Sequence, residues 1–289
     1  PCALKCGADY VTQSTHKTLS AFSQASMIHV GERDFDEGRF REHLNMHTST
    51  SPQYGLLASL DVARKQVSME GFARLSRCVE HACQLREGIS QTRHFRVLER
   101  DDMLPGELAR DGVRLDPTKL TIAVAPERGS ARAIQRALYE RFSIQVEKVT
   151  HNTLSVLVTL GTTPGKVLRL VSALHSLDEG VGEGQATPRP LPPLGRLRLL
   201  PRDAYFAPAR LLPLTDAGHA RNVDLVGRIS ADQVVPYPPG IPVLVPGQEI
   251  SAAVLDFLLA LLQRDTGTEV HALAPRGGGP RLRLVALHP

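Results

Sequence analysis

The sequence lacks any concentrated run of basic residues. Its 289 residues include 34 Lys and Arg against 30 Asp and Glu, a formal net charge of +4, and the basic residues are spread along the whole chain. It has neither a zinc-finger spacing nor a mixed aromatic and basic RNA motif. Nucleic-acid binding is therefore not expected.

The sequence also lacks a long hydrophobic run. Its most apolar window, residues 252–262, falls well short of the roughly 20 residues that a membrane-spanning helix needs. The first residues do not combine a charged segment with an apolar core, as a secretory signal does. From these absences we expect no membrane association and a cytoplasmic location.

Cysteine is scarce, with Cys2, Cys6, Cys78 and Cys83 as the only four. Cys78 and Cys83 flank His81, which raises a metal site as an alternative, but the spacing matches no common zinc pattern. We interpret both cysteines as helix residues and expect no metal. A cytosolic chain gives no reason to expect disulfides.

What the sequence does contain is a soluble globular composition with mixed periodicity. Hydrophobic residues make up 42% and charged residues 22% of a chain long enough for two or three domains. Short strands are expected at residues 10–13, 26–30, 120–125, 144–149 and 154–160. Ser51, Ser130, Thr163 and Ser251 are expected to stand at helix starts, with a further helix after Ser68.

Spacing in the helical regions predicts which faces are buried. Apolar residues every three or four positions form one expected stripe on the helix after Ser68: Phe72, Leu75, Val79, Ala82, Leu85 and Ile89. Residues 180–195 are rich in Gly and Pro and are expected to form a linker. Residues 269–273 and 281–287 are expected to close the fold as a hairpin.

One lysine stands in an unusual setting. The run Ser14-Thr15-His16-Lys17 lies between the two strands expected at residues 10–13 and 26–30. Apolar surroundings or a neighbouring positive charge favour the neutral amine that attacks a carbonyl, and both are available to Lys17. Hydroxyls at Ser14 and Thr15 could hold a phosphate. The alternative is a solvated lysine in a polar turn, which is how most lysines occur.

Further blocks accompany this run. They are NMHTSTSPQYG at residues 45–55, ASLDVA at 58–63, LDPTKL at 115–120, VGRISADQ at 226–233, VPYPPGIP at 235–242 and PG at 246–247. In this order, the blocks and the S-T-H-K run closely resemble the bacterial ornithine/lysine/arginine decarboxylase family, which uses pyridoxal 5'-phosphate. The resemblance extends over nearly the whole chain.

The resemblance implies an α/β fold of the aspartate-aminotransferase type. Residues 1–92 would form the C-terminal part of a large pyridoxal-phosphate-binding domain, and residues 93–180 a small α+β domain. Residues 181–196 would be the linker and residues 197–289 a C-terminal α+β decarboxylase domain. In this family a long stretch precedes the lysine and carries other cofactor contacts. Since residues 1–7 cannot supply them, we expect this chain to be the C-terminal portion of such an enzyme.

The resemblance also implies roles for individual residues. Lys17 would hold the cofactor as a Schiff base, His16 would lie near it and assist proton transfer, and Ser14 would contact the phosphate. Thr48 or Ser49 would reach a phosphate across a homodimer interface. Simple turn and capping chemistry is the alternative for Thr48 and Ser49.

The implied reaction is decarboxylation of a basic amino acid (lysine, ornithine or arginine) to a polyamine-type amine and carbon dioxide. A non-catalytic remnant that retains the fold, or a dimerisation module, stays open as the alternative. An aminotransferase is a third possibility, against which the blocks at residues 48–54 and 236–242 argue.

Overall fold

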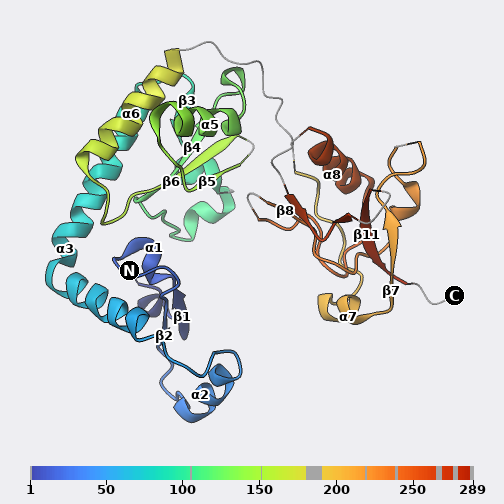
Figure 1. Ribbon diagram of the computed structural model, residues 1–289, viewed down its shortest axis with the longest axis horizontal. Helices are drawn as coiled ribbons and strands as arrows, with labels where there is room; N and C mark the ends of the chain where they lie inside the picture. The colour runs from blue at the N-terminus through green and yellow to red at the C-terminus, as the bar shows by residue number, and fades with distance from the viewer. Residues whose placement is uncertain are drawn as a thin grey trace. The chain divides into compact units, whose positions relative to one another are not determined.

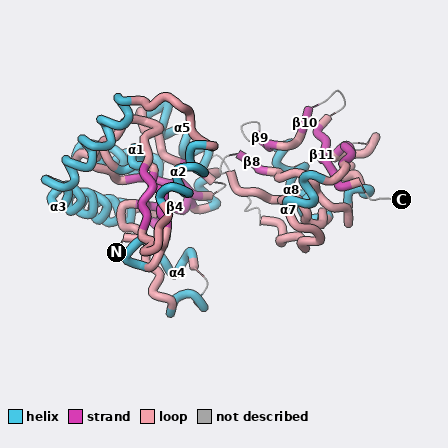
Figure 2. The backbone as a smooth tube through the Cα atoms, turned by 90° about the horizontal axis from the view of Figure 1, so that it is seen from below, coloured by secondary structure: helices cyan, strands magenta, loops and turns pink. Residues whose placement is uncertain are grey.

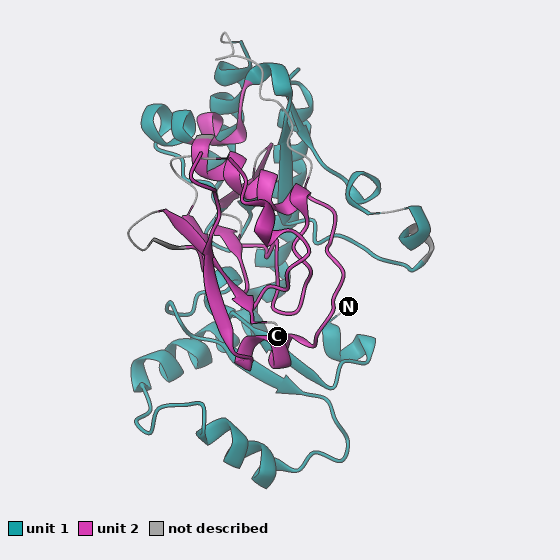
Figure 3. Cartoon of the chain, turned by 90° about the vertical axis from the view of Figure 1, so that its right-hand side faces the viewer, with its two compact units in different colours: residues 1–128, 136–147, 155–183 teal, residues 129–135, 148–154, 184–289 magenta. Residues whose placement is uncertain are grey.

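The computed structural model describes residues 2–104, 106–150, 152–179, 191–218, 220–237, 240–264, 269–275 and 279–286. The described residues form a mixture of helices and strands joined by loops (Figure 2). The chain divides into two compact units (Figure 3): the first contains residues 1–128, 136–147 and 155–183, and the second contains residues 129–135, 148–154 and 184–289.

The first unit begins with an antiparallel pair of strands. After the 3-10 helix η1 (Ala3–Cys6), strand β1 (Tyr10–Gln13) pairs with β2 (Met27–Val30) in the register Tyr10↔Val30. The short helix α1 (Thr15–Thr18) lies between them in sequence. Both strands are confirmed where the sequence predicts them.

An aromatic cluster follows the strand pair. Helix α2 (Glu37–Asn45) contributes Phe40, whose ring stacks on Tyr10 with centroids 6.1 Å apart. Phe35 lies against Phe40 at 5.3 Å, and the Tyr10 hydroxyl donates to Glu32. These contacts hold α2 to β1.

A single long helix, α3, spans Tyr54–Ser90. Two predictions were wrong here. The helix begins at Tyr54 and not at Ser51–Pro52, because Gln53 is still extended, with φ −91° and ψ 93°. No second helix starts after Ser68, because the sequence around it continues the first one.

The expected stripe on α3 is buried only in its C-terminal half. Ala82, Leu85 and Ile89 are buried, whereas Phe72 is 89% exposed, with Leu75 and Val79 also exposed. The difference follows from what covers the helix: α6 (Pro164–Glu179) and β3 (Phe95–Val97) pack along its C-terminal part (Figure 1).

A four-stranded sheet contains β3, β4 (Lys119–Val124), β6 (Thr153–Leu157) and β5 (Lys148–Val149), in that order. Helix α5 (Ala131–Phe142) follows β4 through the turn η3 (Pro126–Arg128). The Ser130 hydroxyl caps α5 by accepting from Ala133 N at 3.2 Å, as predicted. The start of α6 at Pro164 is confirmed, but residues 144–147 are not strand.

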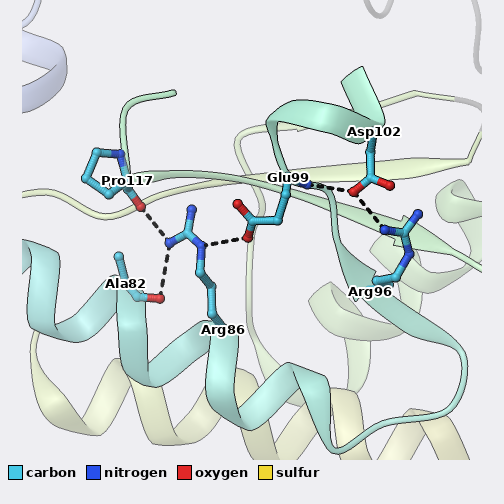
Figure 4. A network of polar contacts seen from close by, with 6 residues as sticks. All are labelled: Ala82, Arg86, Arg96, Glu99, Asp102 and Pro117. Carbon is cyan, nitrogen blue, oxygen red and sulfur yellow. Dashed lines mark hydrogen bonds and ion pairs between the residues drawn. The ribbon is translucent and has the colours of Figure 1, made fainter. Parts of the chain in front are cut away.

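Arg86 of α3 ties the helix to the connection after β3 (Figure 4). Its guanidinium donates to Glu99 at 3.3 Å and to the Pro117 carbonyl at 2.8 Å. Glu99 also caps α4 (Arg100–Met103), which precedes the turn η2 (Gly106–Arg110). Asp102 accepts from Glu99 N and from Arg96, and these bonds hold the pKa of its carboxyl below the usual value.

The second unit has its own core. Helix α7 (Pro201–Phe206), strand β7 (Ala209–Pro213), turn η4 (Val223–Leu225) and strand β8 (Val235–Tyr237) lead to helix α8 (Ala252–Arg264). Strands β9 (Glu269–His271), β10 (Ala274–Pro275) and β11 (Pro280–Val285) follow. The core residues are apolar side chains from these elements and from the loops between them: Leu214, Leu225, Val234, Leu244, Ile250, Val254, Leu255, Leu258, Leu273, Leu282 and Leu284.

The closing hairpin was predicted with the wrong partners. Residues 269–271 pair with β8 and not with β11, and β11 instead pairs with β10 on one side and β7 on the other. The start of α8 is confirmed, since Ser251 accepts from Val254 N at 3.2 Å. Most of the predicted linker, residues 180–190, lies outside the described residues.

Candidate active site

Lys17 lies on α1, immediately after β1. Its backbone N–H donates to the Ser14 carbonyl at 3.0 Å, which closes the first turn of the helix. Ser14 and Lys17 are both exposed, and among the described residues the Lys17 amine has no hydrogen-bond or ion-pair partner. The amine is therefore accessible to a ligand, and the role of Lys17 as the cofactor lysine stays a prediction.

His16 is held by a single carbonyl. The Ala25 oxygen accepts from His16 Nδ1 at 2.9 Å and from the His16 backbone N–H at 3.3 Å. Since a carbonyl oxygen only accepts, Nδ1 must carry the ring hydrogen. In the neutral ring Nε2 is then the acceptor, and it can take up and return a proton.

Thr15 has the one buried hydroxyl of α1. The residue is 5% exposed, and its Oγ1 has no hydrogen-bond partner among the described residues. An unpaired buried hydroxyl costs about 1–3 kcal/mol unless a further polar group reaches it. An orphaned hydroxyl, the exposed Ser14 hydroxyl and an unpaired amine together fit a phosphate-bearing aldehyde such as pyridoxal phosphate.

The segment after α1, residues 19–25, is anchored to α3 by hydroxyl groups that the sequence did not single out. The Ser59 hydroxyl accepts from Phe22 N at 3.2 Å, and Ser20 donates to Gln66 at 2.9 Å. Gln24 in this segment has φ +76°, an uncommon backbone conformation for a residue with a side chain. The only sequence signal was that Ser59 lies in the ASLDVA block.

Thr48 and Ser49 lie in the exposed stretch between α2 and α3. Within the described ranges no hydrogen bond connects either residue with residues 14–17. The structure thus brings His16 and Lys17 together on α1, with Ser14 at its N-cap, and no hydrogen bond joins Thr48 or Ser49 to them among the described residues. Their role at a subunit interface stays a prediction.

The cysteines form no evident metal centre. In the part of the chain that the structure describes, no group of three or more His, Cys, Asp or Glu residues could hold a metal ion. Cys78 and His81 are buried on α3, and Cys83 is exposed. Burial raises the pKa of the Cys78 thiol. None of the helices within the described ranges is both long enough and apolar enough to cross a membrane.

Comparison with known families decides the relationship. The model of the major domain of Orn/Lys/Arg decarboxylases matches residues 4–166, and the model of their C-terminal domain matches residues 201–268. The chain belongs to the Orn/Lys/Arg decarboxylase family. Because the first match contains α1 and α3, it places the S-T-H-K run within the family's major domain.

Two relatives illustrate the range of the family. The arginine decarboxylase of Bacillus anthracis is 32% identical over 263 residues, which cover 89% of this chain and 50% of that protein. The lysine decarboxylase of Pseudomonas aeruginosa is 32% identical over 340 aligned positions, covering 86% of this chain and 44% of that protein. The chain thus spans about half the length of the curated relatives it matches.

Solved structures agree with the predicted α/β fold. The lysine decarboxylase of Francisella novicida superposes with a TM-score of 0.76 at 24% identity, covering 96% of this chain and 49% of that one. The constitutive lysine decarboxylase of Escherichia coli gives 0.74 at 26% identity, with the same coverage. At this level the first match shows the fold alone.

Proposed function

We propose that Lys17 is the cofactor lysine of a pyridoxal-phosphate-dependent decarboxylase that acts on lysine, ornithine or arginine. The observation that carries the proposal is the unpaired Lys17 amine on α1, beside an oriented His16, in a chain of the Orn/Lys/Arg decarboxylase family. Arginine and lysine decarboxylases among the relatives support a basic amino acid as substrate.

The residues of α1 have separate tasks in this proposal. The Lys17 amine would hold the cofactor aldehyde, and the Ser14 and Thr15 hydroxyls would donate to its polar groups. The cofactor, when bound, accepts the electrons left as carbon dioxide departs. His16, with its hydrogen on Nδ1, keeps Nε2 available to take up or return a proton.

The proposed enzyme is a homodimer with a shared site. Thr48 or Ser49 would donate to a cofactor phosphate bound by the partner subunit, as the family resemblance implies, and both residues are exposed in their own chain. The proposed division into residues 1–92, 93–180 and 197–289 assigns α1 and this stretch to one domain.

Chemical labelling tests the lysine. The native protein is loaded with pyridoxal phosphate, reduced with borohydride and mapped by peptide mass spectrometry. The label is expected on Lys17 and is expected to disappear in Lys17→Ala, while Lys65→Ala, at an exposed lysine of α3, keeps it. A label on another lysine would overturn the assignment, and no label at all would favour a non-catalytic module.

Subunit mixing tests the shared site. Lys17→Ala and Thr48→Ala proteins are each expected to lack most activity. Mixed dimers regain one intact site if Thr48 serves the neighbouring subunit, so carbon dioxide release rises above that of either variant. No recovery after demonstrated subunit exchange would contradict the sharing, and the Ser49→Ala protein is tested in the same way.

A further inference from the structure

Ser59 of α3 is buried and uses its hydroxyl twice. The residue is 8% exposed. Its Oγ donates to the Leu56 carbonyl at 2.7 Å and accepts from the Phe22 backbone N–H at 3.2 Å. A hydroxyl has one hydrogen and two lone pairs, so both bonds form together. Ser59 thus joins α3 to a segment 37 residues earlier in the chain.

A continuous series of hydrogen bonds runs from Ser59 to His16. The Phe22 carbonyl accepts from Ala25 N at 3.0 Å, so the same peptide turn that Ser59 anchors also orients Ala25. The Ala25 carbonyl then accepts from both His16 Nδ1 and the His16 backbone N–H. Three hydrogen bonds therefore connect the Ser59 hydroxyl with the imidazole of His16, beside Lys17.

The turn that carries these bonds needs an external anchor. Gln24 lies inside it with φ +76°, a conformation that costs on the order of 1–3 kcal/mol and persists only where the surrounding structure enforces it. A second hydrogen bond from this segment to α3, from Ser20 to Gln66, is exposed to solvent. Ser59 is the buried anchor.

We propose that Ser59 is a positioning residue for the reaction: through Phe22 and Ala25 it holds the His16 ring with hydrogen on Nδ1 and Nε2 free. The inference rests on the proposed function of Lys17 and His16. Removal of the Ser59 hydroxyl leaves the Phe22 N–H without a partner, and the turn can relax towards an unstrained form. The Ala25 carbonyl then no longer fixes the tautomer of His16.

Three variants of Ser59 separate the effect of the hydroxyl from that of side-chain volume. Ser59→Thr keeps the hydroxyl. Ser59→Val has the shape of the threonine variant but no hydroxyl, and Ser59→Ala removes the hydroxyl without adding atoms. In the native protein, Ser59→Val and Ser59→Ala are expected to lower kcat about 10- to 100-fold, as a misplacement of roughly 1 Å does. KM is expected to change little, and Ser59→Thr to retain most of kcat.

A second measurement does not depend on turnover. Nitrogen-15 NMR of the ring, assigned through His16→Gln, is expected to show Nδ1 protonated in the parent protein and in Ser59→Thr. A mixture of tautomers is expected in Ser59→Ala. Ser90→Ala is the control, because Ser90 makes the same bond to a carbonyl three residues earlier (2.7 Å to Glu87) at an exposed position of α3.

The outcomes are distinct. Unchanged kcat and an unchanged Nδ1 signal in Ser59→Ala would overturn the proposal, as would a Ser59→Thr protein no better than Ser59→Val. If Lys17→Ala remains active, the proposed function fails, while a tautomer change in Ser59→Ala would still establish the connection from Ser59 to His16.

Discussion

Gly247 and Gly227 offer a direct test of close packing in the second unit. Both have a left-handed backbone, with φ +89° and +80°, and both donate a backbone hydrogen bond, Gly247 to Ser230 at 2.8 Å and Gly227 to Ile250 at 2.9 Å. They differ in their surroundings. A Cβ at Gly227 would meet nothing within 4 Å, whereas a Cβ at Gly247 would overlap the Leu199 carbonyl oxygen.

The expected costs follow from this difference. Alanine at either position pays about 1–2 kcal/mol for the left-handed conformation. At Gly247 the Leu199 carbonyl must also move, which adds about 1–3 kcal/mol of overpacking. The displacement also weakens the bond from Arg198 N to the Gly247 carbonyl (2.8 Å), at about 1 kcal/mol. We therefore expect about 1–2 kcal/mol for Gly227→Ala and about 3–6 kcal/mol for Gly247→Ala.

Urea denaturation followed by far-ultraviolet circular dichroism measures the free energy of unfolding of both variants. Gly227→Ala is the internal control, since it carries the same backbone strain without the overlap. If the two variants lose equal stability, to within about 0.5 kcal/mol, the packing argument at Leu199 is refuted.

Three further predictions concern the first unit. Gly88→Ala places a Cβ 2.7 Å from both methyl groups of Val171. The overpacking cost of about 1–3 kcal/mol should exceed the helix-propensity gain of about 1 kcal/mol. In thermal denaturation, adding Val171→Ala should restore the stability that Gly88→Ala loses. Burial alone would raise the pKa of Asp178, but the Arg93 and His94 N–H groups and the His94 ring hold it below its usual value. The stabilisation from the Asp178 carboxylate is therefore complete above the unfolded pKa of about 3.9, and it is lost as the pH falls through the lower folded pKa. The difference in free energy of unfolding between the parent protein and Asp178→Asn should be large at pH 7 and should shrink below about pH 4. An equal gap at both pH values would contradict this. Phe40 is only partly buried, so Phe40→Ala should cost about 1–3 kcal/mol, the worth of its two aromatic contacts with Tyr10 and Phe35. A loss within about 0.5 kcal/mol of zero in urea denaturation would contradict this.

Two helix starts were predicted correctly from the sequence, because one turn of the chain contains all the atoms that define them. Ser130 and Ser251 cap α5 and α8 because their hydroxyls reach an N–H only three residues away. The S-T-H-K run was likewise expected between two strands, and β1 and β2 flank it.

Contacts between residues far apart in the chain could not be predicted from local sequence patterns. Residues 269–271 could pair with either β8 or β11, and their alternation says nothing about which partner lies nearer. Ser59 is an ordinary helix residue until its bond to Phe22, 37 positions away, is seen. The exposed Phe72 fits the same helical spacing as the buried Ile89, since spacing defines a face but not what covers it.

The length of α3 has a mechanical consequence. Ser59 and Gly88 lie on the same helix, 29 residues or about 43 Å apart along its axis at about 1.5 Å per residue. Gly88 is the close contact with Val171 of α6, and Ser59 holds the turn beside His16. A tilt of only about 2° at the α6 contact would displace Ser59 by about 1.5 Å, given that axial length. If Lys17 and Ser59 have the proposed roles, a movement of the helix pair far from Lys17 would thus change the rate of the proposed reaction without contact with any group of the site.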